Sequence, residues 1–141
     1  MVLLPKIKYY YEYLFYKFYR FYETGISVWW SEWKASYTID MIVFAIAFIF
    51  AIYYNIFIDR YFHIDQSIII ACYVIFIAIP NYYIFHHKNK WRSIVKKFDC
   101  LPERTNSIGS WIVFAFVLLV GFNFVFAFYN LSQIDWSKYQ Q

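Results

Sequence analysis

The side chains able to do chemistry are few and scattered along this chain. Cys72 and Cys100 are the two cysteines, and His86 and His87 are two of the three histidines. Two isolated cysteines do not make a zinc site of the usual spacing. Adjacent histidines point to different faces of a helix, so they do not converge on one ion. These residues predict no metal site.

Asp59 and His63 form the other pair of interest, because a spacing of four residues can place both side chains on one side of a short segment. No further ligand accompanies them. Motifs such as GxSxG, HExxH or a glycine-rich phosphate loop are absent, and the chain holds only three glycines. We expect a non-enzymatic protein without a cofactor, the enzymatic alternative being lipid-headgroup chemistry by His86, His87 or Asp59.

The elements that must position these residues are membrane-spanning helices. The chain is 62% hydrophobic and 28% aromatic, with 16% charged residues, which is unusual for a soluble domain. Three runs free of Lys, Arg, Asp, Glu and His are long enough to cross a hydrocarbon layer of roughly 30 Å. We predict an all-α integral membrane protein with three transmembrane helices, at residues 41–58, 68–85 and 108–128.

The positive charges give this arrangement an orientation. Eleven of the thirteen Lys and Arg residues lie in the N-terminal segment 1–39 or in the loop 86–107. Positive charge near a span is retained in the cytoplasm. The prediction is a cytoplasmic segment 1–39, a membrane domain 40–131 with its loop 86–107 inside, and an external tail 132–141.

Residues 6–25, KIKYYYEYLFYKFYRFYETG, predict an amphipathic helix that lies on the membrane interface and ends at Gly25. Its apolar face consists of residues at helical spacing: Ile7, Tyr11, Leu14, Phe18 and Phe21. Four further residues lie beside this face and widen it: Leu4, Tyr10, Phe15 and Tyr22. The charges lie opposite, among Tyr9, Tyr13, Tyr16 and Tyr19. Packing on a partner protein is the alternative, whereas four basic against two acidic residues predict no nucleic-acid binding.

The tryptophans before the first span are also expected at the interface. Trp29, Trp30 and Trp33 are anchors by type and position, and they precede Thr38, which would cap the first span, and Asp40 in its first turn.

A short basic amphipathic helix is predicted in the inner loop, ending before Pro102. Its apolar face consists of Trp91, Ile94, Val95 and Phe98. It would continue the second span or rest on headgroups, with docking of an acidic partner as the alternative. Asn106 or Ser107 would then cap the third span.

Three asparagines lie inside the predicted spans, where hydrocarbon offers their amides no partner. Asn55 and Asn123 reach similar depths, so they could share a hydrogen bond worth about 0.6 to 2 kcal/mol. Asn81 follows Pro80, which predicts a kink in the second span. We favour structural roles over an ion pathway. Gly121 is a point of close approach, within the chain or between copies.

The segments VKKFDCLPERTNSIGSWIVF, YNIFIDRYFHID and SQIDWSKYQ resemble small uncharacterised three-span membrane proteins of AT-rich bacterial genomes. The resemblance covers most of the chain. It implies the topology and a bacterial inner membrane, and it carries no activity or site.

Together these patterns predict a protein that acts through contacts in the bilayer, with membrane lipids and another membrane protein, or copies of itself, as partners. It would be a small subunit of a membrane complex or an immunity protein against a membrane-acting toxin. The alternative is a self-assembling pore or membrane-perturbing effector wetted by the asparagines, although no span has a continuous polar stripe.

Overall fold

The computed structural model describes residues 2–25 and 27–139, which form helices and connecting loops and contain no strand. The principal helices are α1 (Leu3–Thr24), α2 (Ser31–Phe57), α3 (Gln66–Tyr73), α4 (Ile79–Asn81), α5 (Lys90–Asp99) and α6 (Glu103–Ser132). A short 3₁₀ turn, Trp136–Lys138, follows α6. The predicted tail 132–141 is thus described as far as residue 139.

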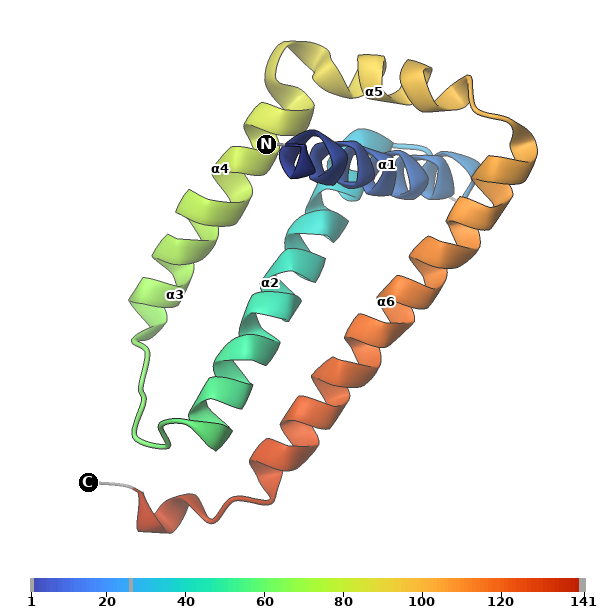
Figure 1. Cartoon of the computed structure of the whole chain (residues 1–141). Helices are drawn as coiled ribbons and strands as arrows, with labels where there is room; N and C mark the ends of the chain where they lie inside the picture. The colour runs from blue at the N-terminus through green and yellow to red at the C-terminus, as the bar shows by residue number, and fades with distance from the viewer. Residues whose placement is uncertain (1, 26, 140–141) are drawn as a thin grey trace.

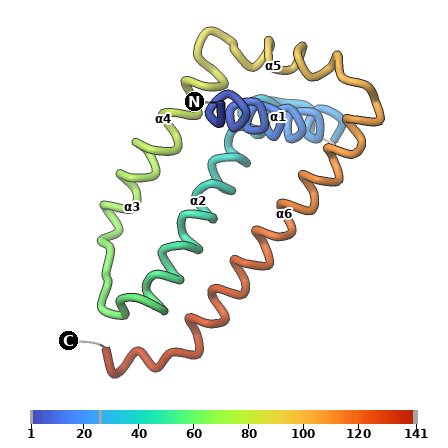
Figure 2. The backbone as a smooth tube through the Cα atoms, viewed as in Figure 1, coloured from blue at the N-terminus to red at the C-terminus, as the bar shows by residue number. Residues whose placement is uncertain are grey.

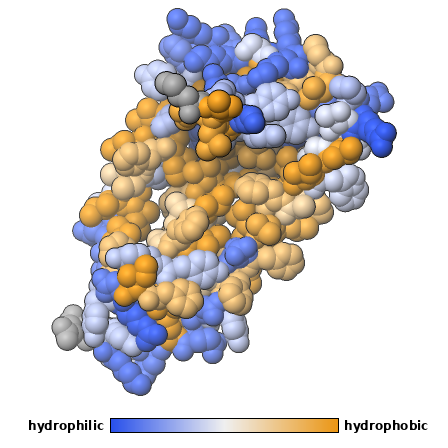
Figure 3. Space-filling view, in the orientation of Figure 1, coloured by the Kyte–Doolittle hydropathy of each residue, from blue (hydrophilic) through white to orange (hydrophobic). Residues whose placement is uncertain are grey.

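Three helical stretches are long and apolar enough to cross a membrane: Ser31–Phe57, Gln66–Asp99 and Glu103–Ser132. Figure 1 shows α2 between α3 and α4 on one side and α6 on the other. In the tube view of Figure 2, α1 runs across one end of these helices and α5 lies beyond it. Polar residues gather at the two ends of the molecule and apolar residues between them (Figure 3).

The helix that contains the first predicted span begins before it. α2 starts at Ser31, ten residues before the expected start at Met41, so Thr38 does not cap it and Asp40 lies in its third turn. The Thr38 hydroxyl instead donates to the carbonyl of Lys34. Residues 31–39 are helical because one side of this stretch, including Ala35 and Ile39, is fully buried under α1.

The helix that contains the third predicted span also starts before it, at Glu103, directly after Pro102. The prediction that Asn106 or Ser107 caps it is therefore wrong. Pro102 fixes the backbone before the first turn. Its lack of a backbone N–H costs nothing there, because that position donates no hydrogen bond within the helix. Asn106 instead accepts a hydrogen bond from Tyr13 and donates to the carbonyl of Phe98.

The second span contains the disturbance expected at Pro80. Two π-helical stretches, Val74–Ala78 and Tyr82–His86, flank α4. Wider turns of this kind accommodate a residue that cannot donate to the preceding turn. The span ends at a sharp corner, where Lys88 and Asn89 both have left-handed backbones, with φ of 56° and 55°. This corner directs α5 back over α1, so α5 neither continues the span nor lies free as an independent interfacial helix.

The larger core lies where α1 crosses one end of the spans. Phe15 stacks on Phe85 with ring centroids 4.3 Å apart, and both side chains are fully buried. Ile94 and Phe98 of α5 close this core from the other side. The side of α5 that carries these residues packs on α1.

The side of α1 that carries the charges is also covered. Tyr16 and Tyr19, expected at a wet headgroup boundary, are buried with exposures of 5% and 8%. Tyr16 packs on Phe98 and Tyr19 on Trp91, both on α5. The amphipathic pattern of α1 did not reveal that a second helix covers this side.

A smaller core joins α2 and α6 in the half of the molecule away from α1. Ile49, Ile52 and Ala127 are buried there, and Phe48 packs on Phe124 and Phe128. Small side chains such as that of Ala127 let two helices approach closely. These two cores hold α2 at the centre of the fold.

Gly109 and Gly121, both on α6, provide a matched test of this packing. A Cβ at Gly109 would lie 1.8 Å from the Tyr13 hydroxyl, whereas a Cβ at Gly121 would meet nothing within 4 Å. We expect Gly109→Ala to displace Tyr13 and destabilise the fold by about 1–3 kcal/mol. Gly121→Ala should leave stability unchanged or raise it by up to about 1 kcal/mol. Thermal unfolding in detergent, followed by circular dichroism, measures both; equal stabilities would contradict the contact between α1 and α6.

Candidate functional site

A chain of buried polar side chains joins α1, the second span and α2. The Tyr11 hydroxyl donates to Asn81 Oδ1 at 2.5 Å, and Asn81 Nδ2 donates to Asp40 Oδ1. Asn81 is 3% exposed and Asp40 is 9% exposed. Three elements that are distant in sequence therefore contribute one group each to a single polar site.

Burial makes this site costly unless every group is paired. Asp40 forms no ion pair with a basic side chain of the described residues, so the Asn81 amide is the contact that satisfies its carboxylate. Burial raises the pKa of Tyr11 to about 12; the hydrogen bond to Asn81 opposes this rise and the charge of Asp40 adds to it. Tyr11 therefore remains a protonated donor at neutral pH.

The sequence pattern singles out Tyr11 and Asn81 separately and places Asp40 at a helix start. The signal that could have revealed the site is a carboxylate directly before a long apolar run, since an ionisable group at such a position needs a partner. The identity of that partner depends on how the second span packs against α2, which residue spacing does not reveal.

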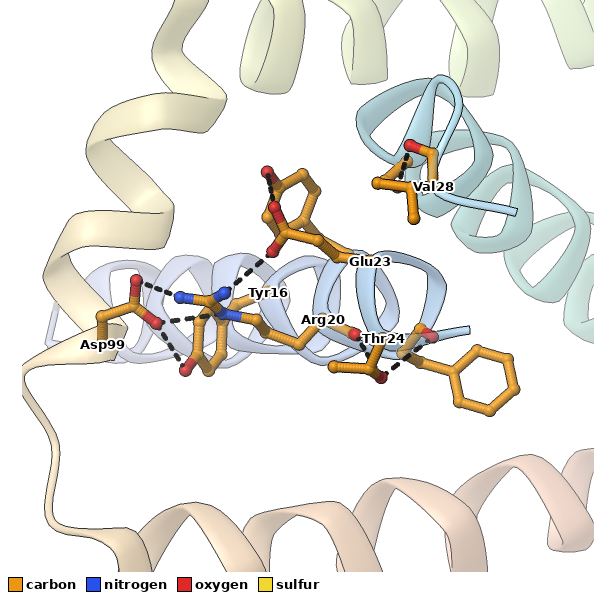
Figure 4. Close-up of polar contacts among 9 residues, drawn as sticks. Tyr16, Arg20, Glu23, Thr24, Val28 and Asp99 are labelled. Atoms are coloured by element: carbon orange, nitrogen blue, oxygen red, sulfur yellow. Dashed lines mark hydrogen bonds and ion pairs between the residues drawn. The ribbon is translucent and has the colours of Figure 1, made fainter. Parts of the chain in front are cut away.

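A second set of polar contacts attaches α5 to α1 (Figure 4). The Arg20 guanidinium donates to both carboxylate oxygens of Asp99 and, at 2.8 Å, to Glu23. The Tyr16 hydroxyl donates to Asp99 Oδ1 at 2.9 Å. Bidentate pairing of this kind fixes orientation as well as charge. It holds one end of α5 over the C-terminal half of α1.

The other contact lies two turns earlier on α1. Lys97 Nζ is 2.9 Å from Glu12 Oε2 and 4.9 Å from the ring centroid of Tyr9. Such partly exposed pairs contribute about 0–1 kcal/mol each, so their main effect is to set register. The charged side chains of α1 thus set the position of α5 along it.

The histidines do not converge. His86 stacks on Trp33 with ring centroids 3.9 Å apart, and its buried Nε2 has no hydrogen-bond partner among the described residues. His87 packs against Tyr83, and His63 is exposed at the opposite end of the molecule. His86 is therefore half-buried. Within residues 2–25 and 27–139, no three His, Cys, Asp or Glu side chains are grouped to hold a metal.

Asn55 and Asn123 do not pair within the chain. The Asn55 amide donates to the carbonyl of Phe62 at 2.8 Å, and the Asn123 amide donates to the carbonyl of Leu119 at 2.9 Å. Each amide finds a nearby backbone acceptor, which satisfies it without a second helix. Asn55 thereby closes the loop after α2 and lines a cavity of about 680 Å³ at that end, together with Arg60 and His63.

The predicted interface residues are distributed unequally. Ile7 and Phe21, near the two ends of α1, are exposed, and Tyr11, Leu14 and Phe18 between them are partly buried. Of the tryptophans, Trp29, Trp30 and Trp33 are exposed and Trp91 is partly buried, while Phe98 is fully buried. The centre of the predicted α1 face is thus covered by this chain's own helices, and only its ends remain free for lipid or a partner.

No family model, curated protein or solved structure matches this chain.

Replacing Asn81 tests the buried polar site. Asn81→Leu keeps the side-chain size but removes the groups that pair with Asp40 and Tyr11, so we expect a destabilisation of about 1–3 kcal/mol. Hydrogen exchange should show faster exchange across α1 as its contact with the spans weakens. Denaturation of the detergent-solubilised protein measures the stability.

The matched control is Asn123→Leu, because Asn123 is exposed and bonds only within its own helix. We expect its stability and its exchange in α1 to resemble those of the wild type. An Asn81→Leu protein as stable as Asn123→Leu would refute a stabilising role of the buried site.

Proposed function

We propose that this chain is a non-enzymatic membrane protein that acts through contacts with another membrane protein. It would serve as a small subunit of a membrane complex or as an immunity protein that blocks a membrane-acting toxin. The observation that carries the proposal is how little apolar surface the spans bury on one another. Only 6% of the residues in the most apolar stretch of α6 and 17% of those in that of the second span are buried, against 33% for α2.

The exposed surface of α6 favours a protein partner. Gly121 lies on it with open space around its missing side chain, and the large neighbour Phe122 is exposed. A glycine beside large apolar residues allows another helix backbone to approach closely, which is how helices associate in a bilayer. Since none of the described residues occupies that position, the approaching helix would come from another molecule.

The polar side chains support the choice of contacts over catalysis or conduction. Asp40, Asn55, Asn81 and Asn123 each donate or accept hydrogen bonds within the chain. A pore built from copies of the chain would need such groups to face a shared opening. Their internal pairing favours a role as an interaction protein.

The proposed location is a bacterial inner membrane, with α1 and α5 on the cytoplasmic side. The support is the concentration of Lys and Arg in the segment before Met41 and in the loop 86–107. The predominantly polar end of the molecule formed by α5 (Figure 3) fits a location outside the hydrocarbon layer.

The orientation predicts the behaviour of a reporter fused after Gln141. With three spans and the N-terminus inside, a phosphatase that folds only outside the cytoplasm should be active there, and one fused in the loop at Lys96 should be inactive. Enzyme activity in whole cells measures both fusions. The reverse pattern would contradict the proposed orientation.

Substitutions on α6 test the proposed contact with a membrane partner. Gly121→Leu fills the open space with an apolar side chain, so the fold and insertion should persist while a partner helix is kept away. Ala115→Leu adds bulk at another exposed position, about 120° around the same helix. We expect Gly121→Leu, but not Ala115→Leu, to reduce co-purification with, or protection against, the product of a neighbouring gene at least about tenfold.

Expression of the chain alone tests the alternative. The proposal predicts unchanged growth and membrane potential in cells that express only this protein. Depolarisation by the lone chain would favour a pore, and equal partner binding by the two α6 variants would exclude Gly121 as the contact.

A further inference from the structure

A second surface lies between the C-terminal half of α1 and the first turns of α6. These two helices enclose a cleft of about 600 Å³. Its lining from α1 consists of Tyr16, Lys17, Phe18, Arg20, Phe21 and Thr24, and its lining from α6 consists of Ser110, Val113, Phe114 and Val117. The polar groups thus lie at the end near α1, and the lining becomes apolar along α6.

Lys17 is the distinctive group of this cleft. Its Nζ donates to the Asn106 carbonyl at 2.5 Å and to the Ser110 hydroxyl at 3.1 Å, both neutral acceptors. Within residues 2–25 and 27–139 it has no carboxylate partner, and burial lowers the pKa of its ammonium group. A partly buried cation without a counter-ion favours the approach of an anion.

Arg20 does not supply this free charge. Its guanidinium is engaged by Asp99 and Glu23 on the α5 side of α1, as Figure 4 shows. The charge of Lys17 is therefore the one that the α1 and α6 cleft presents to a ligand.

We propose that this cleft binds an anionic phospholipid, with the lipid phosphate beside Lys17 and Ser110 and an acyl chain along Val113 and Val117. The proposal concerns lipid binding and does not rest on the protein partner proposed above. A basic group between helices, at the cytoplasmic end of a membrane domain, is a common setting for anionic headgroups.

The layout of the cleft matches the two chemical parts of such a lipid. Ser110 to Val117 spans about 10 Å along α6, or roughly a third of the hydrocarbon thickness. Phe18 and Phe21 form the facing apolar wall from α1. A soluble phosphate would use only the polar end, whereas a phospholipid would also cover the apolar lining.

Native mass spectrometry of the full chain in detergent tests this assignment. We would titrate phosphatidylglycerol, phosphatidylcholine of the same acyl chains, and glycerol phosphate, which lacks the chains. Phosphatidylglycerol should bind one site with about fivefold higher affinity than phosphatidylcholine. Glycerol phosphate should not bind in the same range. Equal affinity for the two lipids, or binding of glycerol phosphate, would overturn the proposal.

Substitutions locate the site. Lys17→Gln should reduce the preference for phosphatidylglycerol about fivefold, and Lys17→Arg should retain it, whereas Lys96→Gln removes an equal charge from an exposed position on α5 and should change nothing. Val113→Phe fills the cleft and should weaken both lipids, while Val125→Phe, an exposed position outside the lining, should weaken neither.

Circular dichroism and the elution profile would establish that each variant is folded. Should Val113→Phe misfold, the comparison of Lys17→Gln with Lys17→Arg still tests the headgroup contact. A folded Lys17→Gln protein that keeps the wild-type preference would refute it, and a folded Val113→Phe protein with unchanged lipid affinity would refute the position of the acyl chain.

Discussion

The burial of α1 between α5 and the ends of the spans is the contact on which the rest of the structure depends. Phe15 of α1 reaches Phe85 of the second span and lies in one core with Ala35 and Ile39 of α2. The other side of α1 covers Phe98 of α5. Without α1, this set of large apolar side chains would have no common partner, because α5 and the spans are brought together largely through it.

Hydrophobic burial is not directional, so the polar contacts decide how α1 lies on the spans. Asn81 connects Tyr11 to Asp40 at one point, and Arg20 and Glu12 fix α5 at two others. A shift of α1 by one residue would rotate Tyr11 away from Asn81 by about 100°. Asn81 Oδ1 would then lose the hydroxyl group that donates to it, which penalises other registers.

The spans themselves form a more open arrangement. α2 packs against α6 through the core around Ile52 and Ala127, but most of the apolar surface of α6 remains uncovered. Lipid or another protein must cover this surface in a membrane, since exposure to water would be costly. Both the proposed partner contact at Gly121 and the proposed lipid site at Lys17 use parts of α6 that this chain leaves open.

The bounds of the helices show which features of the fold a local sequence pattern can predict. A run of about twenty uncharged apolar residues predicts a span because length and hydropathy are properties of the segment alone. Helix ends are different: α2 extends back to Ser31 and α6 to Glu103 because tertiary contacts stabilise polar turns that no hydropathy pattern marks. The sequence likewise predicted an apolar face on α5 but not that this face covers the charged side of α1.

The residues of the candidate site divide in the same way. From sequence alone, Asn81 is a polar residue that needs a partner in the bilayer, and Lys17 is one of several basic residues on an amphipathic helix. Only the tertiary structure gives Asn81 the carboxylate of Asp40, places Lys17 beside Ser110, and separates Asn55 from Asn123. Composition and periodicity determine which face of each helix is apolar, whereas the partner across a helix crossing depends on packing between segments far apart in the chain.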